Sequence, residues 1–288
     1  MLGNNSLGQA FVTTIFGESH GRCVGAVIDG CPAGLQLNET DVQLELDKRI
    51  PKKTRITSTR VEEDKAEILS GVFEKKTTGA PITMVVWNKD VDSQPYERLR
   101  NVPRPGHADY PARVRYGGFN DYRGGGLFSG RLTAAIVMAG AVAKKLLAHV
   151  GAEVFAHTLS IGGISCERTF SREELRTNVY ANAVRCADQN TAALMEEAIL
   201  ETAEKGDSLG GIVRLVAYGI PAGVGEPLFG SLESELARSL FGIPAAKGVE
   251  FGSGFRSARL KGSENNDPIT VREGKVMFET NNAGGILG

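Results

Sequence analysis

The spacing of apolar positions predicts short strands and one helix in the first ninety residues. Residues 9–15, 24–28 and 82–87 are rich in Val, Ile, Thr and Phe, as strands are. Asn38 is placed to cap a helix that ends at Arg49, before Pro51. The acidic stretch 62–67 predicts a second helical segment.

The middle of the chain predicts a buried helix. Residues 130–149 are small and apolar on nearly every face until Lys144, so the helix should be covered all round. A strand is expected at 154–161 and a helix at 191–205, whereas 170–190 carries no clear pattern. Alternation of strands and helices indicates a mixed α/β (α+β) protein.

A short pattern occurs twice. Residues 24–35 and 213–224 each read as a strand ending in G-x-P-A-G, and each is followed by a helical segment. The repetition indicates a duplicated unit. Chance recurrence of a common strand–turn pattern remains the alternative.

Composition excludes several classes of protein. The formal net charge of −1 gives no reason to expect a nucleic-acid or membrane partner. The four cysteines show no metal-binding spacing and predict reduced thiols. The longest uncharged helical run, 132–143, is shorter than the roughly 20 residues that span a bilayer, and no signal peptide is recognisable, so we expect a cytoplasmic protein.

Candidate chemistry gathers between residues 104 and 131. His107 lies in a Pro-Gly turn, and a run of three glycines after Arg123 would let a ligand approach the main chain closely. If Ser129 caps the following helix, the free N–H groups there form an anion site beside Arg123 and Arg131. The plainer alternative is a glycine loop that only turns the chain.

A second histidine lies in the segment Gly17-Glu-Ser-His-Gly21. The segment matches G-x-S-x-G, but a strand follows where a nucleophile elbow needs a helix, which excludes a hydrolase. His20 is either a hydrogen-bonded turn residue or a proton donor. Histidine titrates near neutral pH and arginine binds phosphate in a bidentate manner, so the residues alone support phosphate chemistry and leave the reaction open.

Several long motifs resemble the chorismate synthase family. They are F-G-E-S-H-G at 16–21, R-P-G-H-A-D-Y at 104–110, D-Y-R-G-G-G at 121–126, G-I-P-A-G at 219–223, K-G-V-E at 247–250, and the glycine-rich 281–288. The resemblance implies a layered β-α-β sandwich built from an internally duplicated unit. It implies one domain over residues 1–288 with repeats at about 9–150 and 151–288.

The resemblance also implies an activity. Family members are lyases of the shikimate pathway and aromatic amino acid biosynthesis. They eliminate phosphate from 5-enolpyruvylshikimate 3-phosphate in a trans-1,4 reaction that gives chorismate. They use reduced FMN, with NADPH as a possible reductant, and typically form homotetramers. No metal, nucleic acid or membrane is implied.

Residue roles follow from the matching positions. His20 and His107 resemble the family's catalytic histidines, the first placed to protonate the leaving phosphate and the second serving the flavin. Substrate-binding positions are Ser19, Arg49, Arg55, Arg104 and Arg131. Flavin-contacting positions are Leu127, Phe128, Ser129, Pro244, Ala245 and Gly288.

Two departures from the family pattern affect these expectations. Many members have R-S-S-A-R-E-T where this chain has L-F-S-G-R-L-T at 127–133. The K-P-T and R-H-D segments of the family do not occur, so we expect a C-terminally incomplete domain that binds FMN weakly. The alternative function is a truncated, non-catalytic oligomeric domain that binds a phosphorylated ligand without turnover.

Overall fold

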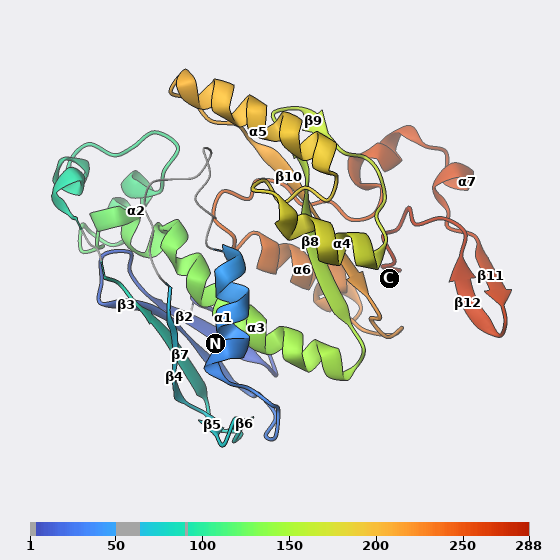
Figure 1. Ribbon diagram of the computed structural model, residues 1–288, viewed down its shortest axis with the longest axis horizontal. Helices are drawn as coiled ribbons and strands as arrows, with labels where there is room; N and C mark the ends of the chain where they lie inside the picture. Colours follow the sequence, from blue (N-terminus) through green and yellow to red (C-terminus); the bar gives the residue numbers. More distant parts are fainter. Residues whose placement is uncertain (1–3, 50–63, 90–91, 288) are drawn as a thin grey trace. The chain divides into compact units, whose positions relative to one another are not determined.

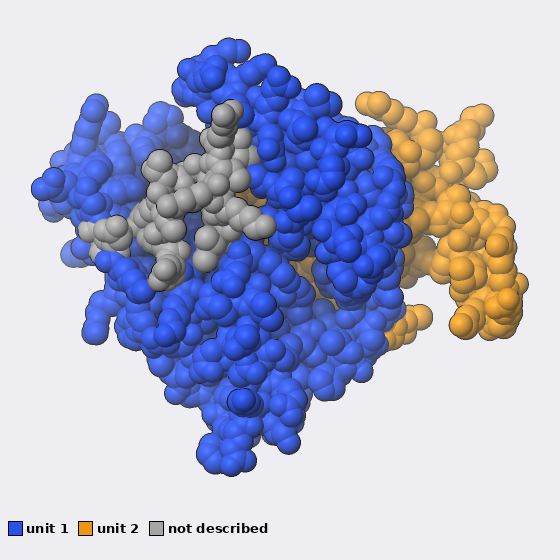
Figure 2. All heavy atoms as spheres, in the orientation of Figure 1, with its two compact units in different colours: residues 1–220 blue, residues 221–288 orange. Residues whose placement is uncertain are grey.

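The computed structural model describes residues 4–49, 64–89 and 92–287. The chain divides into two compact units, Met1–Ile220 and Pro221–Gly288, which Figure 2 colours separately. The boundary between the units follows the second G-x-P-A-G strand, and the repeat boundary near residue 150 stays a prediction.

Unit 1 begins with a five-stranded antiparallel sheet (Figure 1). In spatial order its strands are β1 (Ser6–Leu7), β2 (Val12–Gly17), β3 (Cys23–Asp29), β7 (Ile82–Trp87) and β4 (Ala66–Ser70). The predicted strands are confirmed, but the predicted acidic helix is wrong where it overlaps β4. Ala66 is buried opposite Val86, and Glu67 accepts a hydrogen bond from Trp87 Nε1, so sheet pairing overrides local helix preference.

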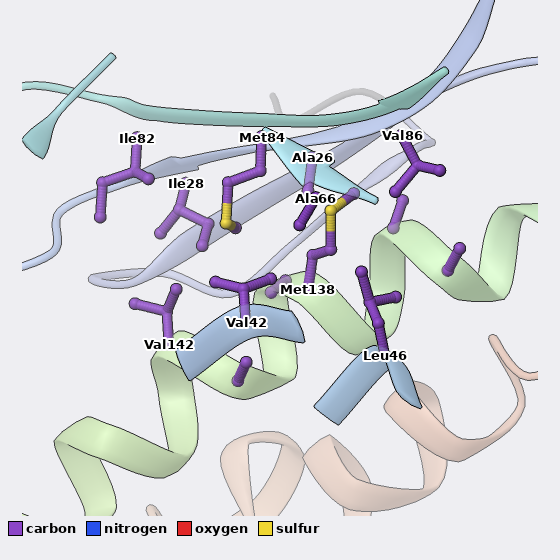
Figure 3. Close-up of a cluster of buried hydrophobic side chains, with 14 of the residues drawn as sticks. Ala26, Ile28, Val42, Leu46, Ala66, Ile82, Met84, Val86, Met138 and Val142 are labelled. Carbon is purple, nitrogen blue, oxygen red and sulfur yellow. The ribbon is translucent and has the colours of Figure 1, made fainter. Parts of the chain in front are cut away.

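Two helices cover one face of this sheet. They are α1 (Glu39–Arg49) and α3 (Thr133–His149), the latter preceded by the 3₁₀ turn η3 (Gly130–Leu132). Asn38 starts α1 as predicted, because its side chain accepts from the Asp41 N–H while its own N–H donates to the Asp41 carboxylate. Figure 3 shows apolar side chains of both helices meeting those of the strands. The labelled helix residues are Val42, Leu46, Met138 and Val142, and the labelled strand residues are Ala26, Ile28, Ala66, Ile82, Met84 and Val86.

Helix α3 is apolar because the fold buries it. The stretch Gly130–His149 is, among the described residues, the one helix long and apolar enough to cross a membrane by length and composition. Its residues Ala134, Ala135, Met138 and Val142 are fully enclosed within the core of unit 1. Packing against the sheet and α1 covers this side of the helix, whereas Ile136 is 38% exposed, so the expected cover on every face is wrong.

A second core of unit 1 forms around a three-stranded sheet. The sheet has the order β10 (Gly211–Tyr218), β8 (Glu153–Ile161), β9 (Ile164–Ser165), and the core includes residues of α4 (Arg172–Asn178), η4 (Val179–Ala181) and α5 (Gln189–Glu204). Helix α4 lies in the stretch for which no pattern was evident, and it starts with a capping box between Ser171 and Glu174. All four cysteines of the chain are free thiols.

The two G-x-P-A-G turns share one geometry. Their first glycines, Gly30 and Gly219, have φ of 79° and 73°, and their last glycines have φ of 88° and 90°. A Cβ on Gly30 would collide with the Ala10 carbonyl, and one on Gly219 with the Gly151 carbonyl. Each glycine thus closes the same end of an antiparallel pair, β2–β3 or β8–β10. The equivalence favours duplication, which stays a prediction.

Unit 2 has a different character. It contains η5 (Leu228–Gly230), α6 (Leu232–Leu240), η6 (Gly254–Arg259), α7 (Gly262–Asn265) and the hairpin of β11 (Ile269–Arg272) with β12 (Lys275–Phe278). Between residues 221 and 287 no residue is buried. Hydrogen bonds order it locally, as where the Asp267 carboxylate accepts from the Asn282 and Ala283 N–H groups.

Short elements complete unit 1. They are the hairpin of β5 (Val72–Phe73) with β6 (Lys76–Thr77), the 3₁₀ helix η1 (Gln94–Arg100), α2 (Asp109–Arg115) and the 3₁₀ segment η2 (Arg123–Phe128). The last two, α2 and η2, belong to the stretch in which the sequence predicts the functional chemistry.

Candidate active site

The glycine run in η2 is a left-handed loop that the sequence can build only with glycine. Gly124, Gly125 and Gly126 have φ of 59°, 84° and 53°. The Ser19 N–H donates to the Gly126 carbonyl at 3.3 Å, which holds the β2–β3 loop against the run. Side chains at these positions would need a strained backbone and would clash with their neighbours.

His20 packs against the first glycine of the run. A Cβ on Gly124 would lie 2.6 Å from His20 Nε2 and 2.7 Å from Ser19 Oγ. The His20 ring is buried, its Nδ1 forms a 2.9 Å hydrogen bond with Ser93 Oγ, and its edge meets Tyr96 at 5.0 Å between centroids. The imidazole is therefore fixed in orientation, with Nε2 toward Gly124.

His107 packs against the next glycine and is held by a carboxylate. A Cβ on Gly125 would lie 3.3 Å from His107 Nε2, while His107 Nδ1 lies 2.7 Å from Asp109 Oδ1. Hydrogen bonds from Arg104 hold the pKa of Asp109 at about 2, against a usual 3.8. Because an ionised carboxylate only accepts, Nδ1 must carry the proton, which leaves Nε2 of the neutral ring as an acceptor.

Arg104 closes the same cluster. Its Nε donates to Asp109 Oδ2 at 2.8 Å, its Nη2 donates to Oδ1 at 2.9 Å, and its main-chain N–H donates to Oδ2 at 3.0 Å. The two-pronged ion pair fixes the guanidinium plane. Its Cζ lies 5.9 Å from the centre of the Tyr96 ring, which also contacts His20. Tyr96 therefore contacts both His20 and Arg104, the arginine whose Nη2 lies 3.2 Å from His107 Nδ1.

A second cluster joins Arg49 and Arg131 through Asp64. Arg49 Nη1 donates to Asp64 Oδ2 at 2.8 Å and Arg131 Nη1 donates to Oδ1, while the Asp64 side chain is only 1% exposed. Arg49 Nε also donates to Thr133 Oγ1 at 3.0 Å, and Arg131 Nε donates to Asn88 Oδ1 at 2.9 Å. Within the part of the chain that the structure describes, one buried carboxylate thus orients two guanidinium groups, a residue type that binds phosphates and carboxylates.

The helix start that follows the glycines is capped as predicted. Ser129 Oγ accepts from the Arg131 N–H at 3.2 Å and so caps the 3₁₀ turn that leads into α3. Leu127 is partly covered, whereas the Phe128 ring is 38% exposed. Arg123 does not contribute a free cation, because the Asp121 carboxylate binds it at 2.9 and 2.8 Å.

The structure brings together some predicted site residues and not others. Ser19, His20, Arg104, His107, Arg49, Arg131 and the segment 127–129 all belong to unit 1. Pro244 and Ala245 are exposed residues of unit 2, the latter with φ of 67°. Arg55 and Gly288 lie outside the described residues. In the described ranges no group of three or more His, Cys, Asp and Glu side chains is placed to hold a metal ion.

Four polar residues of the site were not among the predicted ones: Asp64, Asn88, Ser93 and Asp109. Asp109 lies inside the R-P-G-H-A-D-Y motif, so its contact with His107 could have been found from spacing. Asn88 and Ser93 lie within residues 88–102, which read as an irregular loop in the sequence. Asp64 reads as one of several acids that neutralise a basic surface, and no local pattern distinguishes it.

Comparison with known proteins identifies the family. The chorismate synthase family model matches residues 11–288. The chain is 51% identical over 285 residues to the chorismate synthase of Dehalococcoides mccartyi, covering 99% of this chain and 78% of that protein. It is 51% identical over 287 residues to that of Korarchaeum cryptofilum, covering 100% and 79%. It is 53% identical over 284 residues to that of Methanocella arvoryzae, covering 99% and 76%.

A solved structure agrees. A crystal structure described as chorismate synthase superposes with a TM-score of 0.79 at 31% identity, over 97% of this chain and 80% of that one. The match confirms the α+β class inferred from the pattern of strands and helices. With these relatives and the family model spanning nearly all of its residues, the chain belongs to the chorismate synthase family.

Proposed function

We propose that this chain catalyses the family's lyase reaction, the trans-1,4 elimination of phosphate from 5-enolpyruvylshikimate 3-phosphate to give chorismate. One observation carries the proposal: His20 and His107 pack against the consecutive glycines 124 and 125, at a loop that leads directly into the Arg131 cluster. Two proton-transfer groups and fixed cations beside one loop suit the removal of an anionic leaving group.

His20 is the proposed proton donor to the leaving phosphate. Its Nδ1 forms a hydrogen bond with Ser93 Oγ and its Nε2 faces Gly124, so Nε2 is the nitrogen on the side of the glycine loop. Protonation of the phosphate as it leaves lowers the charge that develops on the departing oxygen. Ser19, whose Oγ lies at the same face of Gly124, offers a hydroxyl to the same oxygen.

Arg49 and Arg131 are the proposed anchors for the substrate's anionic groups. Asp64 fixes one edge of each guanidinium, and the Arg49 side chain remains 27% exposed. Arginine binds phosphate and carboxylate with two parallel hydrogen bonds where its geometry is fixed in advance. Arg104, fixed by Asp109, has the same property near His107.

The residues after the glycines fit reduced FMN, which combines an apolar ring system with a polar tail. The exposed Phe128 ring offers an apolar surface, and Ser129 offers a hydroxyl at a helix start. We propose that Leu127, Phe128 and Ser129 hold the cofactor together with Pro244, Ala245 and Gly288. Bound reduced FMN would supply electron density to the elimination without net redox change, and NADPH is a proposed source of its electrons.

His107 is the proposed proton carrier on the cofactor side. Asp109 orients the ring so that Nδ1 donates and Nε2 faces Gly125. Arg104 Nη2 also lies 3.2 Å from Nδ1 and 3.3 Å from Nε2 of the same ring, so a carboxylate and a guanidinium together fix the imidazole. We propose that His107 takes up or releases a proton at Nε2 from this fixed position. The assembly we expect is a cytoplasmic homotetramer.

A domain that binds phosphorylated ligand without turnover is the second candidate. It is favoured by unit 2, where Pro244 and Ala245 lie and where no residue from 221 to 287 is buried. Anaerobic assay of chorismate formation with reduced FMN distinguishes the two candidates. Turnover that is lost in His20→Ala supports the lyase. Saturable binding of inorganic phosphate with no chorismate formed by the wild-type chain would overturn the lyase proposal in favour of the second candidate.

A further inference from the structure

Asn88 uses its main-chain N–H and both ends of its side-chain amide to join two parts of the site. It directly follows β7, and its main-chain N–H donates to the Arg22 carbonyl at 3.0 Å. Its side-chain Nδ2 donates to the Glu18 carbonyl at 3.1 Å and to the Gly21 carbonyl at 2.9 Å. Its Oδ1 accepts from Arg131 Nε at 2.9 Å.

The donor side of Asn88 fastens the loop that carries His20. The Glu18 and Gly21 carbonyls are the main-chain groups on either side of Ser19 and His20. The loop is also closed by its own Gly21 N–H to Glu18 carbonyl bond of 3.1 Å. Since both carbonyls are bound by one planar amide, the loop cannot turn about this point without breaking two hydrogen bonds.

The acceptor side of Asn88 fastens a buried cation. Arg131 is 8% exposed, its Nη1 binds Asp64, and its Nε is bound by Asn88. Two different partners on two different nitrogens define the guanidinium plane. A shift of Asn88 would therefore rotate Arg131 even while the ion pair with Asp64 persisted.

We propose that Asn88 is a positioning residue that fixes the His20 imidazole relative to the Arg131 guanidinium. The inference deepens the proposed function and rests on it, because the proton donor His20 and the anion anchor Arg131 must act on the same phosphate. Displacement of a reacting group by about 1 Å can cost about 100-fold in rate. The amide is the side chain that fits: it presents two donors and one acceptor in one plane.

Two variants separate the two sides of the amide. Asn88→Ala removes both the amide donors to the loop and the amide acceptor for Arg131. Asn88→Asp keeps the shape of the side chain and an oxygen that can accept from Arg131 Nε. It places a second oxygen opposite the Glu18 and Gly21 carbonyls, so both hydrogen bonds to the loop are lost. Asn101→Ala is the matched control, because Asn101 is exposed and its main-chain N–H donates to the Arg98 carbonyl.

Kinetics and imidazole NMR of the full chain test the proposal. With the unfolding midpoint unchanged, we expect Asn88→Ala and Asn88→Asp each to lower kcat by about tenfold or more and KM to stay within about threefold. The imidazole signals of His20 should shift in both variants, while those of His149 and His157 should not. The Arg131 Nε–H signal should be lost from its wild-type position in Asn88→Ala and persist in Asn88→Asp.

The outcomes separate the inference from the function. Wild-type kcat together with unshifted His20 signals in both Asn88 variants would overturn the inference and leave the function standing. His20 signals that shift in both variants, in a chain that shows no turnover, would support the positioning role and count against the lyase. If Asn88→Ala does not fold, the kcat and the His20 signals of Asn88→Asp alone support or overturn the inference, since this variant preserves the Arg131 contact.

Discussion

Two carboxylates organise this site, the buried Asp64 and the partly buried Asp109, and they differ in where their partners come from. Asp109 binds Arg104 and His107, which lie five and two residues before it in the same motif. Asp64 binds Arg49 and Arg131, which lie 15 residues before and 67 residues after it. The first cluster can form from one short segment, whereas the second requires the helices and the sheet to be in place.

Because of this difference, one carboxylate acts on a proton-carrying side chain and the other holds together residues that are distant in the sequence. The Asp109 cluster contains a titratable imidazole, so its carboxylate affects a proton. The Asp64 cluster contains only arginines, which stay charged at every accessible pH, so its carboxylate affects geometry and net charge. Substitutions in the first cluster should therefore change pH dependence, and substitutions in the second should change stability and anion affinity.

Loss of either histidine should give the largest effect on activity. His20→Ala and His107→Ala should each lower turnover by about 10²- to 10⁴-fold, the usual contribution of a general acid or base. Both should keep the wild-type unfolding midpoint within a few degrees. Steady-state kinetics with His149→Ala as control, an exposed histidine at the end of α3, checks this. Turnover within twofold of wild type would show that the histidine concerned has a structural role and not a catalytic one.

Loss of Asp64 should give the largest effect on stability. Asp64→Ala leaves Arg131 buried without its anionic partner, which typically costs about 3–5 kcal/mol in the free energy of unfolding. Urea denaturation measures it, with the exposed Asp47→Ala as control. A loss below about 1 kcal/mol would show that Arg131 finds another partner, and that the cluster is less tightly coupled than the contacts indicate.

Arg49 tests whether the Asp64 cluster binds anions. Arg49→Ala should weaken substrate affinity by several-fold to about a thousandfold, because a charge-assisted hydrogen bond contributes roughly 1.5–3 kcal/mol. Arg49→Lys should recover part of the loss, since lysine keeps the charge but not the planar fork. Arg55, outside the described residues, is predicted to behave in the same way. Equal affinity in all four variants, measured by calorimetry beside Arg172→Ala, would make both arginines ordinary surface cations.

Asp109 should give the smallest effect and a distinctive pH dependence. Its folded pKa of about 2 lies below the usual 3.8, because Arg104 hydrogen-bonds the carboxylate. The stability it contributes, about 2 kcal/mol, is therefore complete above about pH 4 and is lost as the pH falls toward 2. Denaturation midpoints of wild type and Asp109→Asn should converge over that range. Plots of the two midpoints against pH that stay parallel down to the lowest pH would contradict the lowered pKa of Asp109.

The same contrast explains how far the sequence alone predicts this molecule. Helix α1 was predictable because Asn38 and the two cations of its last turn mark both ends. His20 and His107 were predictable because each lies in a long glycine-bounded motif. Asp64 was not, because its significance comes from a pairing across 67 residues that no local pattern encodes. Strand β4 was misjudged for the same reason: its pairing with β7 outweighs its acidic composition.

The glycine loop has a consequence for how this site responds to mutation. The two imidazoles rest on neighbouring α-carbons, Gly124 and Gly125, whose separation across one trans peptide is about 3.8 Å in any protein. Each imidazole meets a different glycine, and its far side is held by a different residue, Ser93 for His20 and Asp109 for His107. A side chain introduced at one glycine would therefore displace one imidazole and leave the other in contact with its own glycine, so the two proton carriers can be perturbed one at a time.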